Sequence, residues 1–297
     1  IKSRIRDTKF PEGYRTHDVT VAVPLSIPPL GYTTLSLRAG KPGQPSRYPD
    51  TPGLATSERS MANETLSVEI EPNGTLVLTD LRSGAAYRRL LTFEDQADIG
   101  DGWFHGMAVN DRAIVSTTAR SELSLVHNGP LLATFRIRTW LSVPEAFDFG
   151  RMERSERSAE MVIDSLISLR RGQAYLEVET TVANQVNDHR LRVLFPSGAQ
   201  AATYLADSQY DVVERPIALR ADNHLYRELE VETKPQQSWT AVFDDQRGLA
   251  IVAEGLLETA VRDLRHRPHG PDRRRAGRPS ARDAAISLLP RANFRRA

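Results

Sequence analysis

The chain has 297 residues, of which 40% are apolar and 26% are charged, and its net charge is +1. This composition predicts a soluble globular protein with one large all-β domain or two ordinary domains. The absence of cysteine excludes disulfides and cysteine-ligated metals. No apolar run approaches the ~20 residues that a membrane-spanning helix needs, so we expect no membrane partner.

The first ten residues are charged, lack an initiator Met and contain no apolar stretch typical of a signal peptide. We therefore expect a cytoplasmic protein that is part of a longer polypeptide. Residues 1–40 are predicted to be the end of a small β unit, because "VTVAV" and "TTLSLR" alternate with period two. Pro28, Pro29 and Gly31 predict a turn between these two strands. Residues 41–61 are rich in Pro, Gly and Ser, which is typical of a linker.

Residues 62–261 show a strong β pattern. Strands are predicted from Leu66 to Ile70 and from Thr75 to Thr79, joined by a turn at Asn73-Gly74, the strongest short-range hairpin signal. Further strands are predicted in "AIVSTTARSELSLVHNG", "LLATFRIRTWLSV", "MVIDSLISLRRG", "AYLEVETTVANQ", "HRLRVLFPSG", "LYRELEVET", "SWTAVFDDQRG" and "LAIVAEGLL". Many short strands without a long helix predict a β-sandwich or a large antiparallel supersandwich. The aperiodic residues 144–160 are expected to be an excursion with a helical turn.

One segment within this β pattern is unusually dense in polar and aromatic groups. "FEDQADIGDGWFHG", residues 93–106, suits neither a helix nor a regular strand. Its glycines allow the backbone to approach a ligand closely. Trp103 offers a flat face for stacking on a sugar ring, while Asp101 and His105 can hydrogen-bond hydroxyl groups. A structural role is the alternative, in which Trp103 lies in the core and the acids cap turns.

The rest of the sequence contains no catalytic motif. The seven histidines are scattered, and no nucleophile elbow, Walker loop or dinucleotide fingerprint is present. We therefore name no catalytic residue and no metal ligand in this chain. Arg190 and Arg192 share one side of a predicted strand and could bind a hydroxyl or a carboxylate. A solvated face with ordinary salt bridges is the interpretation that we favour for this pair.

The last residues, 262–297, differ in composition from the body. They contain eleven Arg and three Asp, a net charge of +8, which leaves −7 for the rest of the chain. We expect a tail that is irregular or translated out of frame, since out-of-frame GC-rich sequence yields Arg, Pro, Ala and Gly. A basic arm that binds nucleic acid is the alternative, but the body carries no nucleic-acid motif, and we do not expect that partner.

Several separated motifs occur together in one known family. "NGTLVLTDLRSGAAYRRLLTFEDQADIGDGWFHG" resembles the region that opens the C-terminal β domain of family-38 glycoside hydrolases, the α-mannosidases. "DHRLRVLFPSG" and "PQQSWTAVFDDQRGLAIVAEGLLE" are similar to later parts of the same domain. The resemblance covers roughly residues 18–262, in order. It departs from the family in the tail, and at Trp103 and Phe104, where the family usually has tyrosines.

The resemblance implies a galactose-mutarotase-like supersandwich in a parent enzyme that hydrolyses α-mannosides with retention. The family's nucleophile, its acid/base carboxylate and its zinc or other divalent metal belong to an N-terminal catalytic domain, so none of them is assigned to this chain. The domain seen here contributes a wall of the sugar cleft, and Gly100 to His105 match the loop nearest the sugar. The predicted substrate-binding residues are therefore Asp101, Trp103 and His105.

The sequence thus predicts the C-terminal part of an α-mannosidase-like retaining glycoside hydrolase that is inactive alone. Its expected partners are a carbohydrate, an α-mannoside, and the N-terminal catalytic domain, with a homo-oligomer as a further expectation. Three alternatives remain open at this point: a stand-alone carbohydrate-binding module, an epimerase or lyase on the same fold, and a structural or oligomer-forming domain.

Overall fold

The structure is a computed structural model that describes residues 2–5, 15–18, 21, 23–36, 52–101, 105–253, 255–263 and 283–289. Within these ranges the chain is all-β, and every pairing between strands is antiparallel. Its helical segments are two short 3-10 turns, η1 (Ser116–Thr118) and η2 (Asn223–Leu225). The all-β antiparallel fold predicted from the sequence is therefore confirmed.

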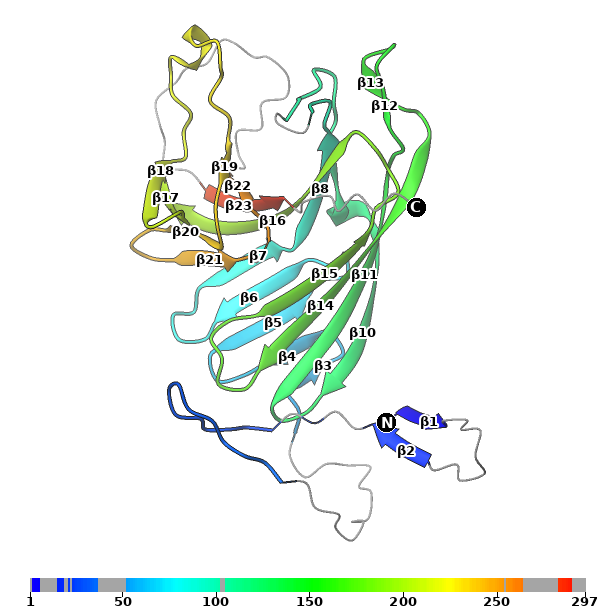
Figure 1. Cartoon of the computed structure of the whole chain (residues 1–297), viewed down its shortest axis with the longest axis vertical. Helices are drawn as coiled ribbons and strands as arrows, with labels where there is room; N and C mark the ends of the chain where they lie inside the picture. Colours follow the sequence, from blue (N-terminus) through cyan, green and yellow to red (C-terminus); the bar gives the residue numbers. More distant parts are fainter. Residues whose placement is uncertain are drawn as a thin grey trace.

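Two sheets face each other around the larger core (Figure 1). The first has five strands in sequential order, β3 (Ala55–Ser57), β4 (Ser60–Ala62), β5 (Leu66–Ile70), β6 (Leu76–Asp80) and β7 (Ala86–Leu90). The second has four strands, β10 (Arg120–Asn128), β11 (Leu132–Pro144), β14 (Ser158–Arg170) and β15 (Glu177–Ala183).

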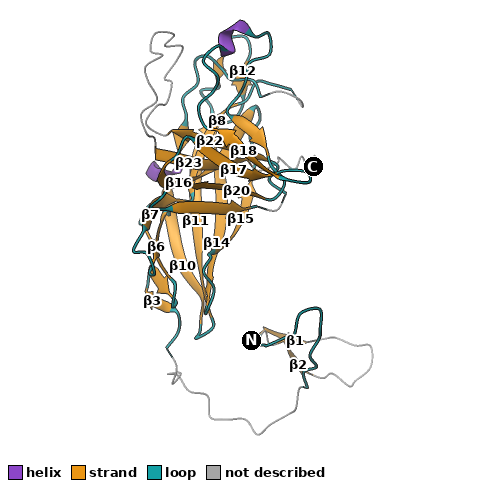
Figure 2. Ribbon diagram, turned by 90° about the vertical axis from the view of Figure 1, so that its left-hand side faces the viewer, coloured by secondary structure: helices purple, strands orange, loops and turns teal. Residues whose placement is uncertain are grey.

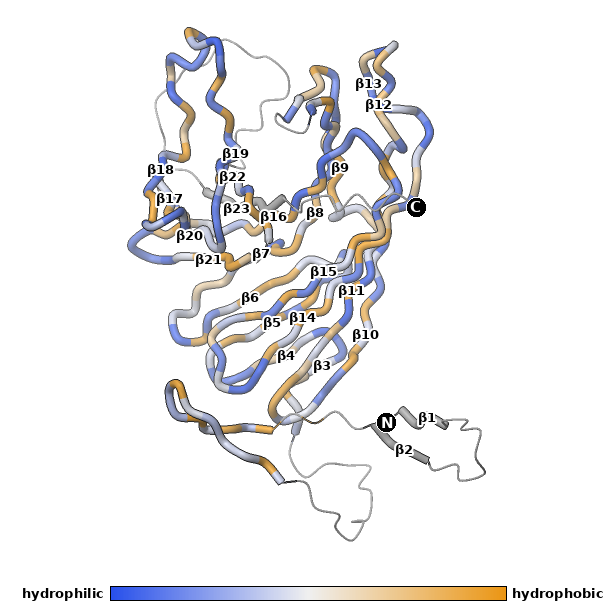
Figure 3. Tube along the Cα trace, in the orientation of Figure 1, coloured by the Kyte–Doolittle hydropathy of each residue, from blue (hydrophilic) through white to orange (hydrophobic). Residues whose placement is uncertain are grey.

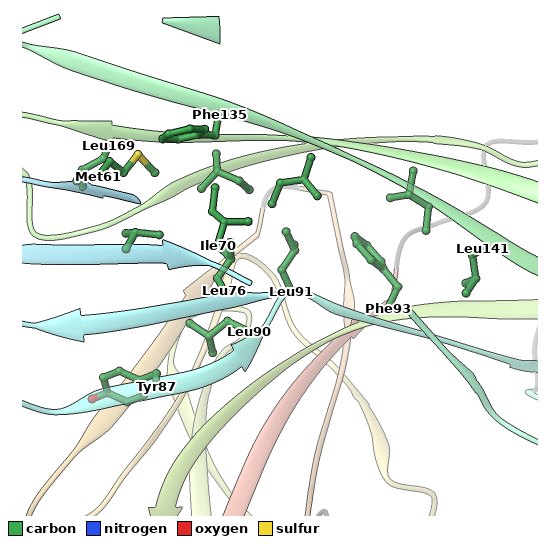
Figure 4. Close-up of a cluster of buried hydrophobic side chains, with 14 of the residues drawn as sticks. Met61, Ile70, Leu76, Tyr87, Leu90, Leu91, Phe93, Phe135, Leu141 and Leu169 are labelled. Atoms are coloured by element: carbon green, nitrogen blue, oxygen red, sulfur yellow. The ribbon is translucent and has the colours of Figure 1, made fainter. Parts of the chain in front are cut away.

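Period-two alternation explains these strands. In β14 every second residue from Met161 to Leu169 is buried, while the residues between them are only partly covered. Figure 3 shows the same alternation of apolar and polar residues along the paired strands. Phe135 and Leu169 on one sheet point toward Ile70 and Leu76 on the other (Figure 4). Each such fully buried side chain contributes about 1.5–3 kcal/mol of transfer free energy.

Two further sheets enclose a smaller core. A six-stranded sheet has the order β19 (Thr233–Pro235), β22 (Glu258–Asp263), β23 (Asp283–Leu289), β16 (His189–Gln200), β8 (Thr92–Ala97) and β9 (Ile114–Val115). A four-stranded sheet has the order β18 (Val212–Pro216), β17 (Thr203–Asp207), β20 (Trp239–Phe243) and β21 (Gly248–Val252). Tyr204, Val242 and Val261 pack between them.

Two short hairpins complete the described fold. β12 (Phe147–Asp148) and β13 (Glu153–Arg154) pair in the segment where we expected a helical turn, which was wrong. β1 (Lys2–Ile5) and β2 (Arg15–Asp18) pair apart from the main body (Figure 2).

The predicted hairpin turns are present. The strands Leu66–Ile70 and Leu76–Asp80 flank Asn73-Gly74, and Gly74 adopts a φ of 84°, which glycine tolerates far better than other residues. Thr75 donates its backbone N–H to Oδ1 of Asn73, which closes the turn. This hairpin therefore follows from local chemistry alone.

Other local predictions differ from the structure. Residues 21, 23–28 and 31–36 are not in strands, although Gly31 donates to the Pro28 carbonyl in the predicted turn. Every side chain of residues 21 and 23–36 is exposed, so the alternation here comes with no buried face and did not make a strand. Leu225 ends the 3-10 turn η2, residues 226–232 are in no strand, and the strand there begins at Thr233. The rest of "VTVAV" and "TTLSLR" lies outside the described residues.

The predicted bounds of the linker and of the tail also differ from the structure. β3 and the first two residues of β4 lie within residues 41–61, which we expected to be linker, and both strands pair into the five-stranded sheet. β23 lies within residues 262–297, which we expected to be irregular, and it pairs with both β16 and β22. The irregular tail is therefore wrong for Asp283–Leu289, because a regular strand lies there inside a sheet. The remaining residues after Asp263 lie outside the described ranges.

Candidate functional site

Three connections project from the same end of the molecule, at the top of Figures 1 and 2. They are the connection from β8 to β9, the β12–β13 hairpin, and the connection from β18 to β19. The first of these contains Asp98 to Gly106, the second part of the acidic and aromatic segment that the sequence singles out. The first part, Phe93–Ala97, lies in β8, so the expectation that this segment suits no regular strand was wrong there, because these residues pair with β16. A shared end is what a composite binding surface requires, since ligand-contacting groups are usually presented by loops on a rigid scaffold.

Asp98 closes the loop that contains the predicted site residues. Its Oδ1 accepts hydrogen bonds from the backbone N–H of Gly100, at 3.1 Å, and of Gly106, at 3.0 Å. Its Oδ2 lies 3.0 Å from Nδ1 of His105. Ile99 donates its N–H to the carbonyl of Gly106 at 2.9 Å, so the two ends of the loop are fastened together. The carboxylate of Asp98 is thus the anchor of the loop.

The glycine at the end of the loop is required by space. A Cβ atom at Gly106 would lie 2.4 Å from the backbone nitrogen of Gly100 and 2.6 Å from the carbonyl carbon of Ile99. Such distances are far inside van der Waals contact, and backbone atoms cannot turn away as a side chain can. Gly106, one of the three glycines of the segment, is therefore required because any larger residue would clash with the backbone.

The three predicted site residues are placed differently. Asp101 is exposed on the loop. His105 is only 16% exposed and turns toward Asp98, so one of its ring nitrogens already has a partner. Trp103 lies outside the described residues, as does Phe104.

The anchor carboxylate is held in its charged form. Burial alone would raise the pKa of Asp98, but the contact with His105 and the hydrogen bonds from Gly106 and Gly100 outweigh it and lower the pKa to about 2. The Asp98 carboxylate that holds the loop is consequently charged throughout the physiological pH range. Its contacts with the loop weaken only when it is protonated.

Below the loop, both faces of β8 carry buried charges. Asp95 pairs with Leu191 and Phe93 pairs with Val193, so Asp95 and His189 lie on the same face as Phe93 and Leu191, which belong to the larger core. Oδ2 of Asp95 lies 2.5 Å from Nδ1 of His189, and Oδ1 lies 2.5 Å from Nη2 of Arg154. Asp95 has no exposed side-chain surface, so this three-residue cluster is a desolvated ion cluster.

His189 is held from both sides. Its Nε2 lies 3.1 Å from Oδ1 of Asn184, and that oxygen also accepts the backbone N–H of Val186. Both ring nitrogens therefore face oxygen atoms, an arrangement that a doubly protonated ring satisfies with two donated hydrogen bonds. The sequence did not indicate this residue, since its carboxylate partner Asp95 lies 94 positions away along the chain.

The opposite face of β8 presents Glu94 and Gln96 to Arg192. Arg192 donates to Oε1 of Gln96 at 2.6 Å and lies 3.8 Å from the Glu94 carboxylate. Its side chain is only 3% exposed. Burial lowers the pKa of Arg192 to about 9, and the neighbouring charges of Arg262 and Arg190 act in the same direction.

These contacts correct the interpretation of the arginine pair. Arg190 and Arg192 do share a face and do form salt bridges, but that face is buried rather than solvated. Arg190 lies 2.6 Å from Glu258 and 3.8 Å from Asp98, so it joins the sheet to the loop. Glu258 of β22 and Asp98 of the loop both reach Arg190, so its charge is paired within the domain.

A pocket of about 490 Å³ lies beside these clusters, between the β8–β9 connection and the β12–β13 hairpin. Arg154, Asp111 and Thr118 are among its lining residues. The sequence did not identify this pocket, because Arg154 lies in an aperiodic segment and Asp111 follows no motif. No signal in the sequence alone joins these positions.

The described residues do not fit a metal site. Within these residues no group of three or more His, Asp or Glu side chains lies close enough to hold a metal ion. The most buried carboxylate, that of Asp95, already contacts Arg154 and His189. In the part of the chain that the structure covers, no helix is long and apolar enough to cross a membrane.

Comparison with known proteins agrees with this fold. The architecture defines an all-β antiparallel domain with two packed pairs of sheets. A family model described as "Glycosyl hydrolases family 38 C-terminal domain" matches residues 61–266. The chain therefore belongs to the C-terminal domain family of the family-38 glycosyl hydrolases, as its motifs predicted.

Individual relatives lead to the same family. A protein of Halalkalibacterium halodurans named "Putative mannosylglycerate hydrolase" is 29% identical over 226 residues, which cover 69% of this chain and 24% of that protein. The crystal structure of a family-38 glycosyl hydrolase protein from Enterococcus faecalis matches with a TM-score of 0.67 and 29% identity, over 83% of this chain and 28% of that one.

A crystal structure described as an alpha-mannosidase from Enterococcus faecalis V583 also matches, with a TM-score of 0.67 and 30% identity. This match covers 80% of the present chain and 26% of that enzyme. The chain thus spans about a quarter of the length of the relatives that it matches.

Proposed function

We propose that this chain is the C-terminal part of an α-mannosidase-like retaining glycoside hydrolase and forms one wall of its sugar cleft. The family match over residues 61–266 supports the class of enzyme, and the relatives carry the names of hydrolases and an alpha-mannosidase. In this proposal an N-terminal catalytic domain supplies the nucleophile, the acid/base carboxylate and zinc or another divalent metal. The chain itself supplies no catalytic residue.

The fastened loop is the observation that carries this proposal. Asp98 ties both ends of the loop together, while Asp101 remains exposed between them. Ends held in this way keep Asp101 and His105 close to a fixed position, which lowers the entropy lost on binding. The sheet end on which it lies also bears two other projecting connections (Figure 1).

Each predicted site residue has a role in this proposal. Trp103 stacks on the face of an α-mannoside or its aglycone, and Asp101 accepts hydrogen bonds from sugar hydroxyls. His105 positions a further hydroxyl with the ring nitrogen that does not contact Asp98. The acids Glu94, Asp95 and Asp98 take no part in contacting sugar, because each has an arginine partner within the domain.

The proposed setting is mannoside metabolism in the cytoplasm. The lack of cysteine supports this compartment, since stabilising disulfides are a common feature of oxidising ones. A homo-oligomer is part of the same proposal, and sedimentation of the intact protein would measure it.

Substitution of the tryptophan in the intact enzyme tests the proposal. We expect Trp103→Ala to lower kcat/KM for an aryl α-mannoside by up to about tenfold, because a lost aromatic stacking contact is worth roughly 0.5–1.5 kcal/mol. Trp103→Phe, which keeps an aromatic face, should retain most of the activity. The isolated chain should not hydrolyse the substrate.

An unchanged kcat/KM for Trp103→Ala would remove the cleft-wall role from this loop. Hydrolysis by the purified isolated chain would contradict the assignment of catalysis to a separate domain. Both outcomes are readable with the same substrate, and a circular dichroism melt of each variant separates loss of contact from loss of folding.

A further inference from the structure

The four-stranded sheet of the smaller core, at the left of Figure 1, has one face buried and the other open to solvent. Tyr204, Thr240 and Val242 are buried on its inner face. The strand register places the alternate residues together on the opposite face, which we call the β20 face. Three residues of each strand form it: Val212, Glu214 and Pro216 of β18; Thr203, Leu205 and Asp207 of β17; Trp239, Ala241 and Phe243 of β20; and Gly248, Ala250 and Val252 of β21.

The β20 face is apolar where the solvated face of a sheet is usually polar. Phe243 is 55% exposed on it and Val252 is 75% exposed. β21 contains no polar side chain, and the single polar side chain of β20 is the buried Thr240. A strand with one solvated face alternates apolar and polar residues, whereas a nearly continuous apolar run is typical of a strand covered on both faces. The composition of β20 and β21 therefore indicates that a second surface packs on this face.

The arrangement of large and small side chains suits an interlocking contact. Ala241 pairs with Ala250 in the middle of the face, and Trp239 and Phe243 lie on either side of Ala241 along β20. Two small residues between two aromatic ones leave room for an apolar side chain of the opposing surface. Aromatic side chains near the centre of an interface usually carry much of its binding energy.

The charges of the β20 face determine which surface fits it. Glu214 and Asp207 are its charged residues, and no residue of the face is basic. Their carboxylates accept hydrogen bonds from the hydroxyls of Thr203 and Ser238, which leave the negative charges in place. Covering a carboxylate is costly unless a cation pairs with it. A second copy of the chain would bring the same carboxylates and no cation on its own β20 face, so the charges disfavour self-association.

We infer that the β20 face packs against another part of the parent polypeptide, one that combines apolar side chains with a lysine or arginine opposite Glu214. The inference rests on the proposed function, in which the chain belongs to a larger enzyme. The relatives that match this chain are about four times as long as the part they share with it, so such a protein has ample sequence to supply the opposing surface. The β20 face includes no residue of the candidate sugar loop.

Hydroxyl-radical footprinting read by mass spectrometry compares the isolated chain with the intact enzyme. We expect the oxidation of Trp239 and Phe243 to be several-fold slower in the intact enzyme, because the core of a packed interface excludes water. Tyr175, in the turn from β14 to β15, is the internal control, because it is 55% exposed, as Phe243 is. Its oxidation should be equally fast in both proteins.

Phe243→Asp provides a second measurement. In the isolated chain this side chain already contacts water, so the melting temperature should change little. In the intact enzyme the new carboxylate lies in the interface, so we expect a lower melting temperature and faster oxidation of Trp239. Phe149→Asp is the matched control, since Phe149 is 58% exposed on the β12–β13 hairpin, and it should affect both proteins alike.

Three results would overturn the inference. The first is equally fast oxidation of Trp239 and Phe243 in both proteins, or slowing of Tyr175 by the same factor. The second is an unchanged melting temperature of the intact enzyme with Phe243→Asp. The third is a dimer of the isolated chain, seen by sedimentation and lost with Phe243→Asp, which would assign the face to a second copy. These readouts are independent of kcat/KM for Trp103→Ala, so this inference and the proposed role of the sugar loop can fail separately.

Discussion

At the scale of single residues, the carboxylate of Asp98 decides how the candidate sugar loop is held. It collects two backbone N–H groups and an imidazole, which is typical of a carboxylate that organises a turn rather than one that reacts. Trp103 and Asp101 could be proposed from the sequence because their chemistry suits a sugar. Asp98 could not be proposed as the anchor of the loop from the sequence, because its partners become its neighbours only when the loop is closed.

The pKa of Asp98 gives a pH-dependent prediction. Its folded pKa of about 2 lies below the ordinary 3.8, so its stabilising effect is complete above about pH 4 and is lost as the pH falls through about 2. We expect Asp98→Asn to lower the free energy of unfolding by about 2 kcal/mol at pH 7 and by almost nothing at pH 2. Urea unfolding at both pH values measures the difference.

Asp245→Asn is the matched control, because Asp245 is exposed and carries the same charge. It should change the free energy of unfolding by less than about 0.5 kcal/mol at either pH. Equal effects of the two substitutions would show that Asp98 does not fasten the loop.

At the scale of elements, β8 and its connection to β9 unite the fold and the candidate site. The two faces of β8 carry separate ion clusters, one around Asp95 and one around Glu94. Period-two alternation places consecutive acids on opposite faces of a strand, so Glu94 and Asp95 of "FED" belong to two different ion clusters. The sequence shows the acids, but only the pairing with β16 shows that their partners are His189 and Arg192.

Gly106→Ala tests the close approach within this connection. The added Cβ would meet the backbone of Ile99 and Gly100, so the loop must open. We expect a loss of about 1–3 kcal/mol in the free energy of unfolding, and weaker activity of the intact enzyme. Gly129→Ala, where the nearest atom would lie 3.8 Å away, should cost far less. Equal melting temperatures for both variants would argue against the tight loop.

At the scale of the whole molecule, four antiparallel sheets form two packed pairs, and the tail completes one of them. β23 lies between β16 and β22, which are far apart along the chain. An Arg-rich and Pro-rich composition concealed this strand, since the alternation in Asp283–Leu289 is weak. Its place inside a sheet depends on two partner strands that local patterns do not reveal.

Shortening the chain tests the place of β23. A chain ending at Asp263 leaves one edge of β16 and one of β22 without a partner strand, and exposed edges promote association. We expect a lower melting temperature and soluble aggregates, measured by circular dichroism and sedimentation. A chain ending at Leu289 keeps β23 and should behave as the full chain. If both shortened chains melt like the full one, β23 does not belong to the sheet.

The sequence by itself determined the all-β class, most hairpins of the main body, the family and the segment that holds the candidate sugar residues. These features depend on alternation, turn chemistry and motifs, which are local. Tertiary structure alone decided which charges are buried, because Arg190 and Arg192 look like an ordinary polar face until other strands cover them. It also decided that Arg154 and Asp111 share a pocket and that the tail contributes a strand. Burial and pairing between distant segments are properties of the packed sheets, so no local pattern could contain them.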